Sequence, residues 1–184
     1  MGSIKPLTKD DWLTQAMELL RTQGVGGVRV LTLAKSLKIS RGSFYWHFHD
    51  RQDLLDHMLD WWDREMTDTV IRYVSKINGK AQKRILALGE FVVRNNMNRY
   101  DSAIRTWAEG DRKAATVLER VMKKRLATMT DLFREAGFSK AEATTRGHLL
   151  AIYIMSEDAV HLNDSLRTRL QLVRRQVQAL TSSE

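Results

Sequence analysis

Side chains suited to contacts with a partner molecule are concentrated in one short part of the sequence, residues 41–51. A guanidinium group can donate two hydrogen bonds to one base edge, and aromatic rings with a polar tip can lie against sugars and phosphates. The outward positions of this stretch combine both kinds of group, and a surface exposed only to water gives no reason for so many aromatics: Arg41, Ser43, Tyr45, Trp46 and His47. We therefore treat these residues as candidates for binding.

Other residue pairs resemble parts of metal or catalytic sites. His47 and His49 are close in sequence, and Glu157 and His161 have the i, i+4 spacing that places both on one helix face. Neither pair has a third ligand nearby, so we interpret His49 as exposed to solvent and Glu157 with His161 as a surface pair. The chain has no cysteine, no glycine-rich phosphate loop and no Ser-His-Asp arrangement. The sequence thus predicts neither an enzyme nor a cofactor or metal.

The elements that position the candidate residues are expected to be helices. The chain has 184 residues, of which 43% are hydrophobic, enough for one ordinary domain or two small ones. Its only proline is Pro6, and from there on apolar residues recur every three or four positions rather than alternating. This spacing predicts an all-α fold.

The charge balance indicates a polyanionic partner. The sequence has 30 lysines and arginines against 22 aspartates and glutamates, a formal net charge of +8. Positive charge also promotes solubility, so the excess alone does not identify the partner. No apolar run approaches the length needed to cross a bilayer, and we expect a cytoplasmic protein with no membrane partner.

Caps and glycines predict where the helices begin and end. Thr8 with Asp11 forms a capping signature, Gly24 is expected to stop the first helix, and Asp50 is expected to cap a long helix that ends near Gly79. We expect helices at about 8–23, 30–37, 41–47, 51–78, 81–97, 101–109, 113–136, 140–162 and 165–180.

Residues 29–51 have the layout of a helix-turn-helix, in which two short helices join at a tight turn and the second enters the major groove. The apolar positions expected to hold these helices against the first helix are Val30, Leu33, Ala34, Leu37, Ile39, Phe44 and Phe48. Across residues 8–60 the sequence resembles the TetR family of bacterial transcriptional regulators, through the motif Leu33-Ala34-x-x-Leu37-x-Ile39-Ser40-x-Gly42-Ser43-Phe44-Tyr45-Trp46-His47-Phe48.

The resemblance implies roles for individual residues. Arg41 and Ser43 would face base edges, and Arg51 would contact a phosphate, which a helix N-terminus also favours. The three aromatic residues that follow Phe44 would contact the DNA backbone or thymine methyl groups. The full set of expected DNA contacts is Arg29, Thr32, Lys38, Ser40, Arg41, Gly42, Ser43, Tyr45, Trp46, His47 and Arg51.

Three positions depart from the usual pattern of the family. Asp50 puts a carboxylate near the expected phosphate. The other two are substitutions by a cation: Arg29 stands where a capping Ser or Thr is common, and Lys38 replaces the glycine of the turn. In a left-handed conformation Lys38 would cost about 1 kcal/mol relative to glycine. Both substitutions add a cation beside the expected DNA, where positive charge favours binding.

The domain prediction places a helix-turn-helix domain at residues 1–50 and a helical ligand-binding and dimerisation domain at residues 51–184. The last helix has apolar residues at heptad spacing, and the preceding one has small residues at intervals of four, which suggests a four-helix dimer seam. Its residues would be Ala143, Gly147, Leu150, Ala151, Ile154, Leu166, Leu170, Val173, Val177 and Leu180. The alternative is that both stripes close the core of their own subunit.

Methionine and aromatic residues in the C-terminal part suit an adaptable pocket for a small molecule. We expect its lining to include Trp62, Met66, Met97, Arg105, Trp107, Met122, Met129, His148 and Tyr153. At helical spacing such residues are more often plain core, so this alternative stays open.

These predictions, with the resemblance, suggest a homodimeric repressor that binds an inverted-repeat operator in double-stranded DNA and leaves it when an unknown small-molecule ligand binds. An activator, a regulator without a ligand and a nonspecific DNA-binding protein are the alternatives.

Overall fold

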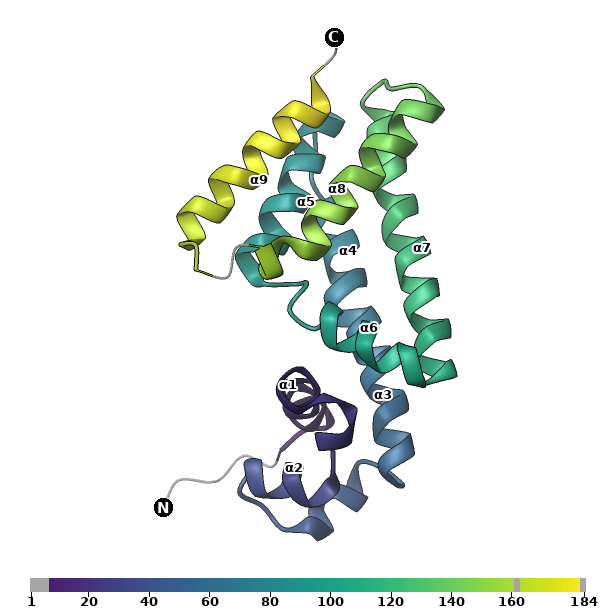
Figure 1. Cartoon of the computed structure of the whole chain (residues 1–184), viewed down its shortest axis with the longest axis vertical. Helices are drawn as coiled ribbons and strands as arrows, with labels where there is room; N and C mark the ends of the chain where they lie inside the picture. The colour runs from purple at the N-terminus through teal and green to yellow at the C-terminus, as the bar shows by residue number, and fades with distance from the viewer. Residues whose placement is uncertain (1–6, 161–162, 183–184) are drawn as a thin grey trace. The chain divides into compact units, whose positions relative to one another are not determined.

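The computed structural model describes residues 7–160 and 163–182. Those residues form helices joined by short connections, and no strand occurs among them (Figure 1). The expected all-α fold is confirmed. In chain order the elements are α1 (Lys9–Gly27), α2 (Val30–Ser36), η1 (Arg41–Trp46), α3 (Arg51–Asp63), η2 (Arg64–Asp68), α4 (Thr69–Ser75), α5 (Ala81–Asn95), α6 (Asp101–Gly110), α7 (Arg112–Glu135), α8 (Lys140–Val160) and α9 (Leu166–Thr181).

The elements group into two compact units. The first comprises the chain up to Trp62 together with Ser102–Val117, and the second comprises Asp63–Asp101 together with the residues from Leu118 onward. The change from one unit to the other falls within the long helical segment that the sequence predicts after residue 50. The division at residues 50 and 51 into two domains stays a prediction.

Local capping explains where the helices of the first unit begin. The Thr8 hydroxyl accepts from the backbone N–H of Asp11 at 3.2 Å, and the Asp11 carboxylate accepts from the backbone N–H of Thr8 at 2.7 Å. This reciprocal capping box confirms the predicted start of α1. Asp50 accepts from the backbone N–H of Asp53 at 2.8 Å, as expected of a cap for α3. Gly24 has a φ of 68° and interrupts α1, which then continues to Gly27.

Aromatic rings form the core of the first unit. Trp12 of α1 is fully buried, and its ring meets that of Phe44 edge to face with centroids 5.6 Å apart. The rings of Phe48 and Phe44 pack together with centroids 5.3 Å apart, and Leu33 and Ala34 are also buried. This confirms four residues of the predicted core, while Val30, Leu37 and Ile39 are only partly buried.

In the second unit, α9 packs against α5 at very short range. Val173 and Val177 of α9 are buried, and a Cβ atom built on Gly89 of α5 would lie 2.8 Å from Val173 Cγ2. On α8, a Cβ atom at Gly147 would lie 3.0 Å from the backbone nitrogen of Thr130 in α7. The small residues therefore permit close helix contacts within one chain.

This packing buries most of the predicted dimer seam within one chain. The single chain already buries eight of the ten residues that were expected there: Ala143, Gly147, Leu150, Ala151, Ile154, Leu170, Val173 and Val177. The alternative left open by the sequence, in which both stripes close the core of their own subunit, accounts for these eight. Leu166 is exposed and Leu180 is partly exposed.

A buried ion pair also corrects the sequence interpretation. Glu157 was expected to form a surface pair with His161, which lies outside the described residues. Instead Glu157 is 1% exposed and accepts hydrogen bonds from Arg169 of α9, at 2.6 Å from Nε and 2.5 Å from Nη2. A buried carboxylate needs such a partner, so the pair ties α9 to α8.

Candidate DNA-binding surface and pocket

The turn between α2 and η1 holds Lys38 in the left-handed conformation, with a φ of 57°. The backbone N–H of Lys38 donates to Lys35 O at 3.2 Å, and that of Ile39 donates to Ala34 O at 3.0 Å. These two bonds form a Schellman motif at the end of α2, where glycine is the usual residue. The expectation of a left-handed lysine in this turn is confirmed, and its side chain is exposed.

The short helix η1 presents the candidate base-reading residues. It is a 3₁₀ helix whose Phe44 side chain is buried, while Tyr45 and Trp46 are 54% and 87% exposed. Arg41 is also exposed, and its Nη2 donates to the Tyr45 hydroxyl at 3.3 Å. This hydrogen bond raises the pKa of Arg41 further above the neutral range. The buried phenylalanine thus holds one face of η1 against the core and leaves a cationic, aromatic face outside.

The other predicted DNA contacts lie around this face. The Ser40 and Ser43 hydroxyls are 3.1 Å apart, so they bond to each other, and the Ser40 side chain does not cap η1. Arg29 is exposed, and its Nε donates to Gly26 O at the end of α1 at 2.9 Å. Gly42 is exposed, whereas Thr32 and His47 are partly buried.

Arg51 has a structural role that the sequence did not predict. Its Nε donates to Val28 O at 2.7 Å, and its Nη2 donates to Val25 O at 2.6 Å. The first residue of α3 thereby satisfies carbonyl groups at and just beyond the end of α1. Contact of Arg51 with a phosphate stays a prediction, and these two bonds must persist alongside it.

Leu31 belongs to the candidate surface and was missed by the sequence interpretation. It is on α2 and is 66% exposed, although leucine usually packs inside. Its neighbour Leu33 is fully buried. The signal was present in the helical periodicity, because residue 31 does not share the face of Leu33, Ala34 and Leu37.

A family comparison matches the segment that contains this surface. The sequence model described as bacterial regulatory proteins of the tetR family matches residues 13–58. Residues 13–58, a quarter of the chain, thus match the TetR family. The description of that model is one of bacterial regulatory proteins.

Two curated relatives support the TetR assignment over the N-terminal part. The HTH-type transcriptional regulator AcrR of Shigella flexneri is 29% identical over 72 residues, which are 39% of this chain and 34% of that protein. Tetracycline repressor protein class E of Escherichia coli is 38% identical over 50 residues, which are 27% of this chain and 24% of that protein. The matches therefore span about a third and a quarter of these relatives.

Solved structures of TetR-type regulators resemble the fold over nearly the whole chain. A TetR-family transcriptional regulator from Streptomyces coelicolor has a TM-score of 0.76 at 16% identity, covering 96% of this chain and 90% of that chain. A transcriptional regulator from Saccharomonospora viridis, solved in complex with choline, has a TM-score of 0.76 at 17% identity, covering 92% and 95%. At such identities the likeness concerns the fold alone.

Within the described part of this chain, no helix has the length and apolar character to span a bilayer.

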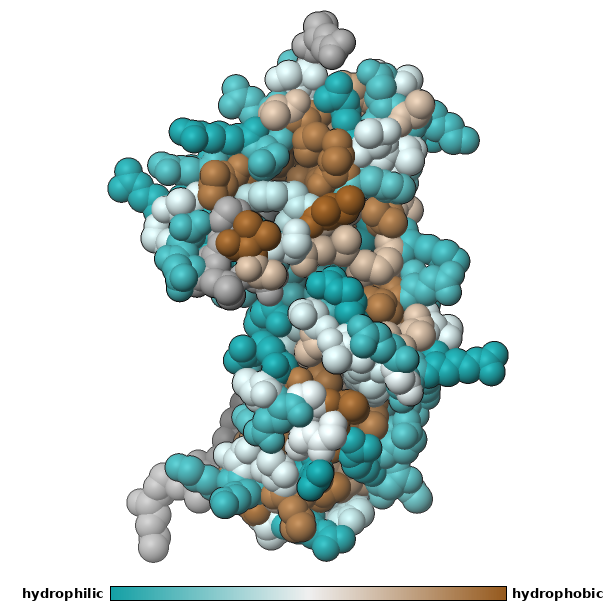
Figure 2. All heavy atoms as spheres, viewed as in Figure 1, coloured by the Kyte–Doolittle hydropathy of each residue, from teal (hydrophilic) through white to brown (hydrophobic). Residues whose placement is uncertain are grey.

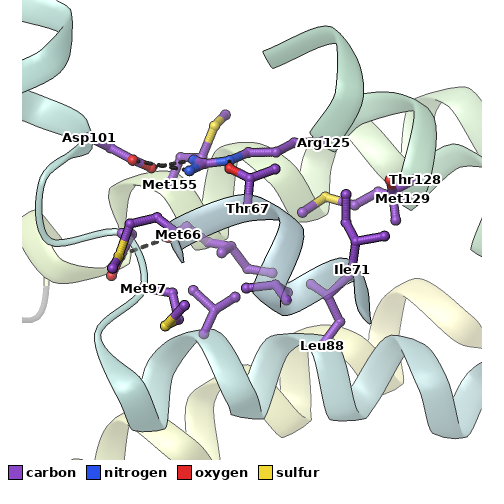
Figure 3. Close-up of a pocket in the computed structure, with 14 residues that line it drawn as sticks. Met66, Thr67, Ile71, Leu88, Met97, Asp101, Arg125, Thr128, Met129 and Met155 are labelled. Atoms are coloured by element: carbon purple, nitrogen blue, oxygen red, sulfur yellow. Dashed lines mark hydrogen bonds and ion pairs between the residues drawn. The ribbon is translucent and has the colours of Figure 1, made fainter. Parts of the chain in front are cut away.

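The second unit contains an apolar pocket. Its wall is formed by 14 residues from η2, α4, α5, α7, α8, the connection from α5 to α6 and the first residue of α6 (Figure 3). Met66, Met97 and Met129, which the sequence predicted as lining residues, are among them. The cavity measures about 40 Å³, room for a few water molecules.

Six other predicted lining residues lie outside this pocket. Trp62 and Trp107 are buried in the first unit, and Arg105 and His148 are exposed. Met122 and Tyr153 are partly buried but do not line the pocket, and burial together with the nearby Glu157 carboxylate raises the pKa of Tyr153. A prediction based on residue type alone therefore included residues that line the pocket and residues that lie elsewhere.

The sequence interpretation missed the polar part of the pocket wall. Arg125 Nη1 donates to Asp101 Oδ2 at 2.5 Å, and Arg125 Nε donates to Thr67 Oγ1 at 2.9 Å. Asp101 and Thr67 are 1% and 2% exposed. An arginine between the apolar positions Val121 and Met129 of α7 was the available signal, because a charge near a buried helix face needs a partner.

Proposed function

We propose that this protein is a transcriptional regulator of the TetR family, a homodimeric repressor that binds an inverted-repeat operator and is released from it by a small-molecule ligand. In this proposal residues 1–50 form the DNA-binding domain and residues 51–184 form the ligand-binding and dimerisation domain.

The exposed face of η1 carries the DNA-binding part of the proposal. Arg41 presents donors that match a guanine edge, and Tyr45 and Trp46 present rings beside it while their helix is anchored through buried Phe44. Leu31 adds an apolar side chain that suits a thymine methyl group. Exposed aromatic residues next to a cation are better explained by DNA than by water.

The exposed apolar residues of α8 and the start of α9 support a dimer through a face different from the buried stripes. Leu149 and Ile152 of α8 are 51% and 62% exposed, and Val160 and Leu166 are exposed as well. Figure 2 shows hydrophobic side chains at the surface over these helices. An exposed apolar patch on a regulator that binds an inverted repeat favours a two-fold symmetric interface.

The pocket supports release by a ligand. Four of its lining residues are methionines, whose flexible side chains can make room for a molecule larger than the present cavity. The similar structure from Saccharomonospora viridis is described as a complex with choline, so a protein of this fold can hold a small molecule. Release requires that the ligand bind more tightly to a state of the dimer with low operator affinity.

Selection of binding sites from random duplex DNA, at near-physiological salt, tests the proposal. An enriched inverted repeat would support a dimeric, sequence-specific regulator. Binding without enrichment would favour the alternative of a nonspecific DNA-binding protein. With an operator in hand, a reporter assay distinguishes repressor from activator, and operator binding that no small molecule alters would favour a regulator without a ligand.

A further inference from the structure

The chemistry of the pocket wall restricts the kind of molecule it can take. We propose that the ligand is an uncharged, mainly apolar molecule, an inference that rests on the ligand-release function proposed above.

Apolar side chains dominate the wall. Methionines reach it from four different parts of the second unit, and Ile71 and Leu88 close another side (Figure 3). Methionine side chains adapt to the shape of an apolar guest, but they offer only a weak hydrogen-bond acceptor. The four methionines are Met66, Met97, Met129 and Met155.

The two charged residues of the wall neutralise each other. Arg125 and Asp101 form a two-contact ion pair, at 2.5 Å between Nη1 and Oδ2 and 3.3 Å between Nη2 and Oδ1. Both side chains are largely buried, at 11% and 1% exposed. The other lining residues are uncharged, so the wall has no net formal charge.

The remaining polar side chains of the wall are bonded within the protein. Thr67 Oγ1 accepts from Arg125, and Asn98 Nδ2 donates to Ile154 O at 2.9 Å. The Thr128 hydroxyl donates to Lys124 O at 2.9 Å, within its own helix. These hydrogen bonds hold the wall together.

A charged ligand would therefore meet an unfavourable site. It would lose its hydration and either remain without a counter-ion or separate Arg125 from Asp101, which would leave one of those charges unpaired inside the protein. An uncharged apolar ligand avoids both of these free-energy costs, and burial of its apolar surface stabilises the complex. The net neutrality of the wall thus selects against both anions and cations.

A series of ligands with one chain and different head groups tests this inference on the full-length protein without DNA. Octanol, octanoate and octylammonium would compete with the neutral fluorescent probe N-phenyl-1-naphthylamine at neutral pH. We expect octanol to displace the probe at a concentration roughly tenfold or more below either ion, because only the ions meet the desolvation cost. Octanoate or octylammonium competing as well as octanol would overturn the inference.

Two tryptophan variants on α7 locate the binding. Met129→Trp fills the pocket, whereas Met122→Trp makes the same change on the same helix outside it. We expect Met129→Trp to abolish octanol binding and Met122→Trp to retain it, with both variants checked for helicity and thermal unfolding. An equal loss of octanol binding in both variants would contradict a site in this pocket. So would octanol binding that Met129→Trp leaves unchanged.

A complementary charge variant covers the case in which Met129→Trp does not fold. Met129→Lys places an unpaired cation on the wall, so we expect octanol binding to fall and octanoate binding to rise above that of the wild type. Octanoate binding that stays at the wild-type level would count against the charge argument.

Operator binding separates this inference from the proposed function. Octanol that binds in the pocket without altering operator affinity supports the ligand class and contradicts ligand release. A failure of octanol to bind, in a protein that still selects an inverted repeat, overturns the ligand class and leaves the DNA-binding part of the proposed function intact.

Discussion

At the scale of single side chains, Arg41 is the residue to test for base reading. We expect Arg41→Ala to reduce the preference for one base pair of the selected operator by about 1–3 kcal/mol, because a guanidinium contact to guanine would be lost. Binding to operators substituted one base pair at a time measures this. Arg94→Ala, which removes an exposed arginine of α5, is the matched control. An equal loss of affinity for every operator would assign Arg41 to a phosphate instead.

The backbone at Lys38 gives a second prediction at this scale. Lys38→Gly should raise the free energy of unfolding by about 1 kcal/mol, because glycine adopts a positive φ without the steric cost of a Cβ atom. Lys38→Ala removes the same charge but keeps the Cβ atom, so it should bring no such gain. Urea unfolding of both variants separates the two effects. Identical stability of the glycine and alanine variants would refute the backbone explanation.

At the scale of helices and their ends, Arg51 joins α3 to the end of α1. We expect Arg51→Ala to lower the free energy of unfolding by roughly 1–3 kcal/mol, because Val25 O and Val28 O lose a charged donor. Thermal unfolding and the salt dependence of operator binding should be measured together. A smaller salt slope with unchanged stability would mean that Arg51 acts only on a phosphate.

The cap of α3 gives a pH dependence with a defined sign. The hydrogen bond from the Asp53 backbone N–H lowers the pKa of Asp50 below its ordinary value. The resulting stabilisation is present above the ordinary carboxyl pKa and is lost as the pH falls through the lowered pKa of the folded protein. Asp50→Ala should therefore be less stable than wild type at neutral pH, and the difference should shrink in acid. A constant difference from neutral to acid pH would exclude this origin.

The sequence correctly predicted the helix caps and the left-handed turn, because each depends on residues close together in the chain. The capping residues Thr8 and Asp50 and the left-handed Lys38 depend on neighbours within a few positions. The partners of Arg51 and Arg125 depend on residues that folding brings together, at sequence separations of 23 and 26 for Arg51 and 24 for the Asp101 bond. Spacing along the chain can indicate that a charge needs a partner, but it does not identify which residue that partner is.

At the scale of the whole molecule, the dimer interface is the main test. Leu149→Glu with Ile152→Glu should give monomers, because two carboxylates would enter an apolar interface. Sedimentation at micromolar concentration and operator binding measure the result, with exposed Ala127→Glu of α7 as the control. A dimer that survives both glutamates would move the interface elsewhere.

A substitution in the buried stripe should behave differently. Val173 is fully buried against Gly89 of α5, so Val173→Asp should destabilise the second unit rather than only separate subunits. Loss of helicity, or a much lower unfolding temperature, is the expected result. A fully folded monomer would instead restore the dimer seam predicted from the heptad spacing.

The heptad stripe of α9 allowed two interpretations from sequence, a face buried within one chain or a seam between two chains. The spacing correctly indicated a face that must be buried, since Leu170, Val173 and Val177 are all buried. Whether α5 of the same chain or a second chain covers that face depends on tertiary packing, and Gly89 decides it by allowing α9 to approach closely. The family resemblance covered only the N-terminal third, so it could not resolve this question.

The π-helical turn at Arg64–Asp68 has a consequence for how this protein tolerates changes in length. The turn lies between α3 and α4, and Lys124 of α7 bonds to the residue before it, Asp63, at 2.7 Å and to its last residue, Asp68, at 2.9 Å. A π turn contains about one residue more than an α turn. Deleting one residue here could leave a continuous α-helix, whereas the same deletion within α5 or α7 would rotate every later side chain of that helix by roughly 100°. Evolutionary insertions and deletions in the helix that runs from α3 to α4 should therefore concentrate at this turn.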